Sequence, residues 1–346
     1  MTREYYHLPD GAKISPVRPG KGLQAPSEDL PKLQQYYRQH IQPKASKYER
    51  LRIKSLKQCR TRVALFVLTL VVTLLLVWHY WYDLMYYSSL GPEASFALAL
   101  TPVLLMFFWC KKPIKAFQTQ VKKDLFPLIF RYFGDDFTFS PNDGLPLRPF
   151  RDAGILPKHD IARASDFITG GYKQVELGIS ELVLKSEYRD SKNKKRTSEV
   201  FKGLAMTFTV PQNFGCHAVL IRDRGLLGKL SSSYSGLEQM KLEDPVFEKE
   251  FDVFADNQIN GRVLMNPLFM ERLLDLSKKF GRDLRCAFHG RQLLILFPSN
   301  KDRFETASIF EGATFEKEFS QIHSEMQQLF AIIDILKLET RAGYQA

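Results

Sequence analysis

The sequence has little cysteine and lacks the short motifs that identify common enzyme classes. Four cysteines are scattered through 346 residues, which argues against a disulfide framework and favours a reducing compartment. There is no glycine-rich phosphate loop followed by Lys-Ser or Lys-Thr, no dinucleotide fingerprint, no His-Glu-x-x-His pair and no Gly-x-Ser-x-Gly elbow. The sequence therefore predicts no particular reaction and no cofactor. It leaves enzymatic activity open and favours a protein without it.

A cleavable secretory signal is also missing from the sequence. The first long apolar run begins at Val63, after a polar leader, whereas the apolar core of a signal peptide lies close to the N-terminus. We therefore expect the apolar run to stay in the mature protein. Residues 1–26 contain four prolines and no hydrophobic period, and we expect them to form a flexible tail.

Two long apolar runs lie within residues 63–110, which we expect to form a transmembrane hairpin. The first, residues 63–82, has twenty residues, enough at about 1.5 Å per residue to cross a hydrocarbon core of about 30 Å. The second covers residues 91–110 and contains Pro102, which a membrane helix tolerates as a kink. The alternative, two buried helices of a soluble protein, would need a much larger globule around them.

The charges around the two runs predict an orientation. The chain has a formal net charge of +11, and much of the excess flanks the runs, whereas the connector between them has no lysine or arginine. The positive-inside rule then places both termini in the cytoplasm. The residues expected to contact the anionic membrane surface are Arg50, Arg52, Lys54, Lys57, Arg60, Arg62, Lys111, Lys112 and Lys115. The aromatic residues expected at the membrane interface are Trp78, Tyr80, Trp81, Tyr82 and Trp109.

The rest of the chain is expected to be helical near the membrane and mixed beyond it. Residues 27–62 predict a basic cytoplasmic lead-in of two helices, with a break or bend at Pro43. Residues 111–134 predict a juxtamembrane helix that continues from the second run. Residues 135–346 predict a cytoplasmic α+β domain with a mainly antiparallel sheet and a long C-terminal helix. The fold class is therefore an α+β membrane protein with a two-helix hairpin.

The period of the apolar residues predicts the elements of this domain. We expect an irregular connection over residues 135–160, a helix opened by Asn266-Pro267, a hairpin with its turn at His289-Gly290, and a final helix from about Thr314. That helix is expected to pack on the domain, with self-association as the alternative. The expected strands cover residues 172–188, 199–210, 217–223, 237–242, 251–254, 260–264, 284–288 and 292–297.

Three groups of polar residues are candidate sites. Two cysteines and two histidines could form a tetrahedral zinc site, although neighbouring residues of a strand point to opposite faces. Acidic residues after Gly134 could bind a hard cation, and the basic loop at residues 192–196 could contact RNA, a lipid headgroup or an acidic partner. We favour a protein without a bound metal. We also favour no nucleic acid, since stacking aromatics are missing from the basic loop. The zinc candidates are Cys216, His217, Cys286 and His289; the acidic candidates are Asp135, Asp136, Asp143 and Asp152.

Several segments give the chain a family resemblance. They are Phe-Arg-Tyr-Phe-Gly-Asp-Asp at residues 130–136, Ser-Glu-Val-Phe-Lys-Gly-Leu at 198–204, Asp-Pro-Val-Phe-Glu-Lys-Glu-Phe-Asp-Val-Phe at 244–254, and Phe-Met-Glu-Arg-Leu at 269–273. Over residues 30–338 the chain resembles an uncharacterised bacterial membrane family, catalogued as a numbered domain of unknown function, whose genes often lie beside those of LemA-type membrane proteins. The resemblance implies a bacterial inner-membrane location and no assigned activity, so it supplies no catalytic residues.

These observations lead to three hypotheses about function. The first is a membrane-anchored scaffold that presents a cytoplasmic binding domain to a membrane or cytosolic protein, for which a LemA-type protein is a candidate. The second is a membrane-tethered enzyme acting on a lipid or cell-envelope precursor, which would need acidic residues such as Asp135, Asp136 and Asp252 to converge on a pocket. The third is a channel or transporter subunit, which would need the hairpin to form a homo-oligomer. The absence of charged residues from residues 63–82 and 94–110 disfavours it.

Overall fold

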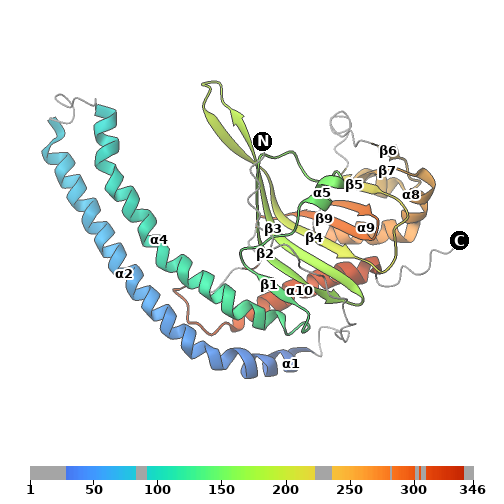
Figure 1. Ribbon diagram of the computed structural model, residues 1–346, viewed down its shortest axis with the longest axis horizontal. Coiled ribbons are helices and arrows are strands. Elements are labelled where there is room, and N and C mark those ends of the chain that lie inside the picture. The colour runs from blue at the N-terminus through green and yellow to red at the C-terminus, as the bar shows by residue number, and fades with distance from the viewer. Residues whose placement is uncertain are drawn as a thin grey trace. The chain divides into compact units, whose positions relative to one another are not determined.

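The computed structural model describes residues 29–82, 92–222, 236–280, 283–300, 304 and 309–338 (Figure 1). The expected flexible tail and the connector between the apolar runs lie outside the described residues. The chain forms two compact units. We call Leu30–Leu128 with Glu305–Phe319 the helical unit, and we call the unit built on Ile129–Phe304 and Ser320–Ala346 the sheet unit.

The helical unit begins with three consecutive helical elements. They are α1 (Asp29–Tyr36), the π-helical segment η1 (Tyr37–Ile41) and α2 (Gln42–His79). The expected break at Pro43 takes the form of this π-helical turn, in which the Gln42 N–H donates to the Tyr37 carbonyl five residues back. Proline has no N–H for the usual bond to the fourth residue before it, and a widened turn accommodates its ring without ending the helix.

A second long helix, α4 (Pro92–Phe130), runs beside α2 (Figure 1). It contains most of the second apolar run and continues into the juxtamembrane segment, as the sequence predicts, with Pro102 inside it. The two helices are antiparallel. The Tyr36 hydroxyl donates to the Leu128 carbonyl at 2.7 Å, and farther along α2 the ring centroids of Phe66 and Phe107 are 6.3 Å apart.

The sheet unit contains one nine-stranded sheet in which every recorded pairing is antiparallel. Its strand order is β1-β2-β3-β4-β9-β8-β5-β7-β6. The predicted α+β class, antiparallel sheet and C-terminal helix are confirmed. The strands are β1 (Thr138–Ser140), β2 (Ile161–Tyr172), β3 (Val175–Arg189), β4 (Lys195–Thr209), β5 (Ala218–Arg222), β6 (Glu238–Met240), β7 (Phe251–Ala255), β8 (Arg285–His289) and β9 (Gln292–Pro298).

Both faces of the sheet are covered, which gives three layers. On one face, β-strand residues such as Leu184 and Leu294 form a buried cluster with Phe150 of α5 (Arg148–Asp152). On the other face, Phe269 of α9 (Pro267–Phe280) contacts Phe288 of β8, with ring centroids 5.7 Å apart. The long helix α10 (Glu316–Leu336) also packs on the sheet unit, where Phe330 stacks on Tyr172 at 4.4 Å.

Three sequence predictions for the sheet unit were wrong or incomplete. The expected strand at residues 260–264 is part of the helix α8 (Gln258–Leu264), whose first amides are bonded to the Asn257 side chain. Asn257 is a favourable N-cap residue, so a helix rather than a strand follows it. Strand β2 and the short helix α7 (Pro245–Glu250) were not predicted, and β2 contains two glycines that weaken a strand pattern. The connection at residues 135–160 also contains β1 and α5.

Candidate functional site

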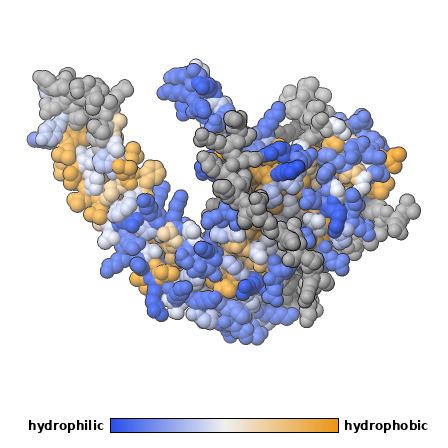
Figure 2. All heavy atoms as spheres, viewed as in Figure 1, coloured by the Kyte–Doolittle hydropathy of each residue, from blue (hydrophilic) through white to orange (hydrophobic). Residues whose placement is uncertain are grey.

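The most exposed apolar surface of the described chain lies on α2 and α4 of the helical unit. On α2, nine leucine and valine side chains between Val63 and Leu76 are 44–62% exposed, and on α4 five leucine and phenylalanine side chains between Leu100 and Phe108 are 43–66% exposed. Figure 2 shows apolar residues gathered along these two helices. A surface of this extent is unusual for a soluble protein and typical of one that contacts lipid or a partner.

One helical stretch meets the length and hydropathy expected of a membrane span. It is Pro31–His79, and it alone does so among the described residues. This suggests membrane association. The second span, on α4, and the two-helix hairpin stay predictions.

At one end of the apolar surface, α2 and α4 are joined by Arg62. Its Nη1 donates to the Trp109 carbonyl at 2.9 Å, and its guanidinium carbon lies 4.2 Å from the centroid of the Trp109 ring. The thiol of Cys110 donates to the Arg62 carbonyl at 3.2 Å. One residue further along, Lys111 lies over the Phe107 ring at 4.2 Å. These cation–π contacts keep two positive charges at the edge of the apolar surface.

The other expected membrane contacts are placed in different ways. Arg50, Lys54, Lys57, Arg60, Lys112 and Lys115 are exposed. Arg52 is not, since only 15% of its side chain is accessible. Of the expected interface aromatics, Trp78 is 84% exposed, whereas Trp109 is partly covered and lies against Arg62.

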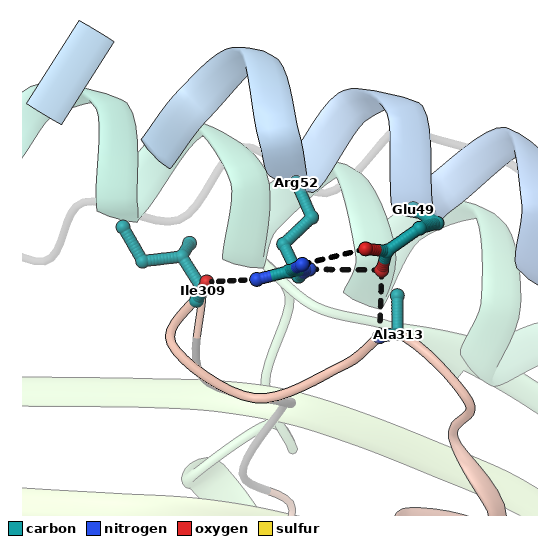
Figure 3. A network of polar contacts seen from close by, with 4 residues as sticks. All are labelled: Glu49, Arg52, Ile309 and Ala313. Carbon is teal, nitrogen blue, oxygen red and sulfur yellow. Dashed lines mark hydrogen bonds and ion pairs between the residues drawn. The ribbon is translucent and has the colours of Figure 1, made fainter. Parts of the chain in front are cut away.

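Arg52 belongs to a polar network that we call the clasp, formed by Glu49, Arg52, Ile309 and Ala313 (Figure 3). Arg52 donates twice to the Glu49 carboxylate, through Nε at 2.8 Å and Nη2 at 2.5 Å, and its Nη1 donates to the Ile309 carbonyl at 3.0 Å. The Ala313 amide donates to the same carboxylate at 3.0 Å. The bonds from Arg52 and Ala313 lower the pKa of Glu49 to about 2. The clasp thus fastens residues 309–313 to α2.

An aromatic contact beside the clasp fastens the same segment. The buried ring of Tyr48 meets Phe315 edge-on, with centroids 5.4 Å apart, and the Tyr37 hydroxyl donates to the Thr314 carbonyl at 2.8 Å. Phe315 has a φ of 61°, a backbone conformation that costs a bulky residue about 1–3 kcal/mol. Burial of its ring offsets this cost. Burial, and then the nearby Asp124, raise the pKa of Tyr48 to about 12.

The sequence did not predict the clasp. Glu49 is the only acidic residue within residues 44–62. Its partner Ala313 and the Arg52 partner Ile309 each lie more than 250 positions away. An isolated acid among many bases was the one signal that could have pointed to it, because a single carboxylate in such a field gains a strong partner.

The four zinc candidates do not form one metal site. The rings of His217 and His289 lie 5.0 Å apart, but Cys286 and His289 are three positions apart on β8 and so point to opposite faces of the sheet. Cys286 is fully buried, and burial raises the pKa of its thiol, which disfavours the thiolate that zinc requires. Among the described residues no group of three or more potential ligands is close enough to hold a metal ion.

Two of the acidic residues that the enzyme hypothesis requires, Asp136 and Asp252, also lie apart. Asp136 accepts a bond from the Gly171 amide at 2.7 Å, next to the edge strand β1. Asp252 lies on β7 and accepts from Gln239 at 2.8 Å. Six strands separate β1 from β7, which corresponds to roughly 30 Å. The sheet therefore does not bring these carboxylates to one pocket.

The basic loop at residues 192–196 forms the tip of the β3–β4 hairpin, which projects from the sheet (Figure 1). Residues 191–200 are all exposed. The tip is held by Asp190, which accepts from the amides of Lys192 and Lys194, each at 2.9 Å, and from Arg196 Nε at 3.1 Å. These donors lower the pKa of Asp190. The loop is thus an ordered, positively charged surface.

Comparison with known proteins gives one family match, which covers part of the chain. Residues 199–338 match the model of DUF3137, described as a protein of unknown function, which supports an uncharacterised domain family for this region. No curated protein matches the chain. The crystal structure of the mycobacterial trehalose monomycolate transport factor A, TtfA, is 8% identical in sequence with a TM-score of 0.32, over 60% of this chain and 92% of that one. A score this low does not establish a shared fold.

Proposed function

We propose that the protein is a membrane-anchored scaffold whose α2 and α4 cross the bilayer as a hairpin and whose sheet unit binds a protein partner in the cytoplasm. The observation that carries the anchor is the exposed apolar surface of α2 and α4, which ends at a cluster of basic residues. No acidic residue occurs within residues 50–82 or 94–123. Uninterrupted positive charge beside an apolar span is what an anionic leaflet attracts.

The orientation follows from where the basic residues lie. They precede the first apolar run and follow the second, and the connector has none, so both termini are proposed to be cytoplasmic. Together with the family resemblance, this charge distribution supports the proposal of a multi-pass protein of a bacterial inner membrane.

The clasp supports a scaffold role. It fastens residues 309–313 to α2, and this segment continues in sequence into α10. By the bounds of the two units, the chain passes from one to the other after Asp29, Leu128, Phe304 and Phe319, and the last of these points lies within α10, just after the clasped segment. The clasped segment, held on α2, is thus one of the chain segments that link the proposed anchor to the sheet unit, and this supports a scaffold.

We propose a membrane or cytosolic protein as the partner, with a LemA-type protein as one candidate, and anionic headgroups as the lipid contact. A homo-oligomer is a further candidate. The specific observation against an enzyme is the separation of Asp136 and Asp252 on the sheet.

Reporter fusions test the orientation. Alkaline phosphatase and green fluorescent protein are fused after Ala346 and, separately, inserted after Ser88 in the connector. We expect fluorescence without phosphatase activity at Ala346 and the reverse at Ser88. Phosphatase activity at Ala346 would contradict the proposed topology, and activity at neither position would contradict the hairpin.

Purification of the full-length protein in detergent tests the scaffold. A tag at the C-terminus is used to isolate the protein from bacterial membranes, and co-purifying molecules are identified by mass spectrometry. We expect one membrane or cytosolic protein in a reproducible ratio. A co-purified metabolite with no protein partner would instead favour an enzyme.

A further inference from the structure

An open groove runs along the helical unit between the apolar surface and its basic end. It has a volume of about 490 Å³ and is lined by Leu65 of α2 and by Leu105, Met106, Phe108, Trp109 and Lys112 of α4. The α4 residues recur at steps of three and four, so they form one side of that helix. Five of the six lining residues are apolar or aromatic, and the only charge is at one end.

The apolar part of the groove has the character of a site for a hydrocarbon chain. Leu105 and Phe108 are each 66% exposed and Leu65 is 47% exposed, so an occupant could cover surface that the protein leaves open. Burying one methylene group contributes about 0.8 kcal/mol. A groove of this volume is therefore sufficient to favour part of one acyl chain.

Lys112, the charged residue of the groove, differs in its contacts from the neighbouring basic residues Arg62 and Lys111. Arg62 is bonded to the Trp109 carbonyl, and Lys111 lies over the Phe107 ring. Lys112 is exposed, and within the described chain it forms no ion pair. The nearest acids in sequence on α4 are Glu93 and Asp124. An anion at this position would meet positive charge without a competing carboxylate.

We propose that this groove binds one anionic phospholipid of the bilayer, with an acyl chain along Leu65, Leu105 and Phe108 and the phosphate on Lys112. The inference rests on the proposed membrane anchor and deepens it, because it changes a general attraction to the leaflet into a defined site. Charge complementarity at Lys112 and the apolar lining select a lipid over a free phosphate.

Trp109 lines the groove and supplies the probe for a test. The chain has three tryptophans, so Trp78→Phe with Trp81→Phe leaves Trp109 as the single emitter. The full-length variant is reconstituted in vesicles with phosphatidylglycerol or phosphatidylcholine carrying brominated acyl chains, and quenching is measured. We expect phosphatidylglycerol to be preferred at Trp109 by about fivefold, the ratio that corresponds to roughly 1 kcal/mol per basic residue near the surface.

Substitutions at the neighbouring residues Lys111 and Lys112 distinguish a defined lipid site from diffuse electrostatic attraction to the leaflet. Lys112→Ala should abolish the preference, Lys112→Arg should keep it, and Lys111→Ala should change it by less than twofold although it removes the same charge. Equal effects of Lys111→Ala and Lys112→Ala would overturn the site, as would equal quenching by both lipids in the parent. Vesicles that fail to retain the protein would overturn the site together with the anchor, so the two failures are distinguishable.

The far end of α2 supplies the matched control. A variant with Trp81→Phe and Trp109→Phe leaves Trp78 as the emitter, close to the connector that has no lysine or arginine. We expect no preference for phosphatidylglycerol at Trp78. A preference equal to that at Trp109 would overturn the proposal that the site lies at Lys112.

Discussion

The apolar runs of the helical unit and the core of the sheet unit differ in how far their apolar side chains are exposed. Leu75 of the helical unit is 62% exposed, whereas Leu294 of the sheet unit is 1% exposed, although both belong to regular elements. In the sheet unit, layers on both faces remove such side chains from water, the usual source of stability for a soluble domain. In the helical unit no layer of the described chain covers them. The sheet unit is thus stabilised by its own core, whereas the apolar runs of α2 and α4 present surface that the described chain does not cover.

Their polar contacts differ as well. The clasp of the helical unit is a bidentate ion pair with two backbone partners. In the sheet unit, Lys173 forms an ion pair with Asp334 at 2.6 Å and ties the β2–β3 turn to α10, with both side chains more than a third exposed. Charge-assisted bonds to backbone groups stabilise more than an exposed pair. Loss of the clasp should therefore be the larger loss.

The double variant Leu68→Arg, Leu75→Arg is expected to have the largest effect, because it changes the exposed apolar surface that distinguishes the helical unit from the sheet unit. Each arginine costs about 2.5–3.5 kcal/mol near the centre of a membrane helix, so the pair costs about 5 kcal/mol or more. We expect the protein to leave the carbonate-washed membrane fraction, measured by immunoblot. Both parent side chains are exposed, so no packing inside the chain is lost.

Its matched control is the double variant Val246→Arg, Leu268→Arg in the sheet unit. These two side chains are 62% and 55% exposed, and the charge added is the same. The control should stay in the membrane fraction. If it left as well, added charge rather than lost lipid contact would explain the result.

Phe208→Ala should destabilise the sheet unit by about 3–5 kcal/mol, because it leaves a cavity in a closed core. Phe208 is 0% exposed. The change is measured by urea unfolding of the full-length protein in detergent. Ile259→Ala, at a side chain 76% exposed in the same unit, should change stability by less than about 0.5 kcal/mol. Equal effects of the two variants would show that the sheet unit has no well-packed core.

Glu49→Gln should loosen the clasp by about 1–2 kcal/mol, the range for a hydrogen-bonded charge reduced for partial exposure. We expect amide exchange at Ala313 to accelerate about tenfold, whereas the exposed Glu271→Gln on α9 should leave it unchanged. Because the pKa of Glu49 is lowered from 4.5 to about 2, its contribution is present above pH 4.5 and is lost as the pH falls toward 2. Glu49→Gln should lack this acid-dependent step. An unchanged exchange rate at Ala313 would contradict the clasp.

Lys173→Ala should have the smallest effect, a loss of about 0.2–1 kcal/mol from the sheet unit, since exposed ion pairs contribute little. Urea unfolding at low and high salt is the measurement, and the difference from the parent should shrink at high salt. A loss larger than that of Glu49→Gln would reverse the ranking of the two polar contacts.

Much of the fold follows from local patterns in the sequence. Asn266-Pro267 predicts the start of α9, and the apolar runs around His289-Gly290 predict the β8–β9 hairpin; both are confirmed. Each depends on residues close together in the chain, so the signal is local. Strand β2 was missed because Gly170 and Gly171 obscure the alternation, and its place in the sheet depends on pairing with β3.

For the candidate site, too, one part follows from the sequence and another part only from the tertiary structure. The apolar runs and their basic flanks depend on composition alone, so the sequence predicts an anchor and its flanking charges. The tertiary structure decided which charges have partners: Arg52 lies in the clasp, Arg62 lies against Trp109, and Lys112 stays exposed at the end of a groove. It also separated Cys286 from His289 and Asp136 from Asp252. Contacts between residues far apart in the chain arise only when helices and strands pack, and no local pattern records them.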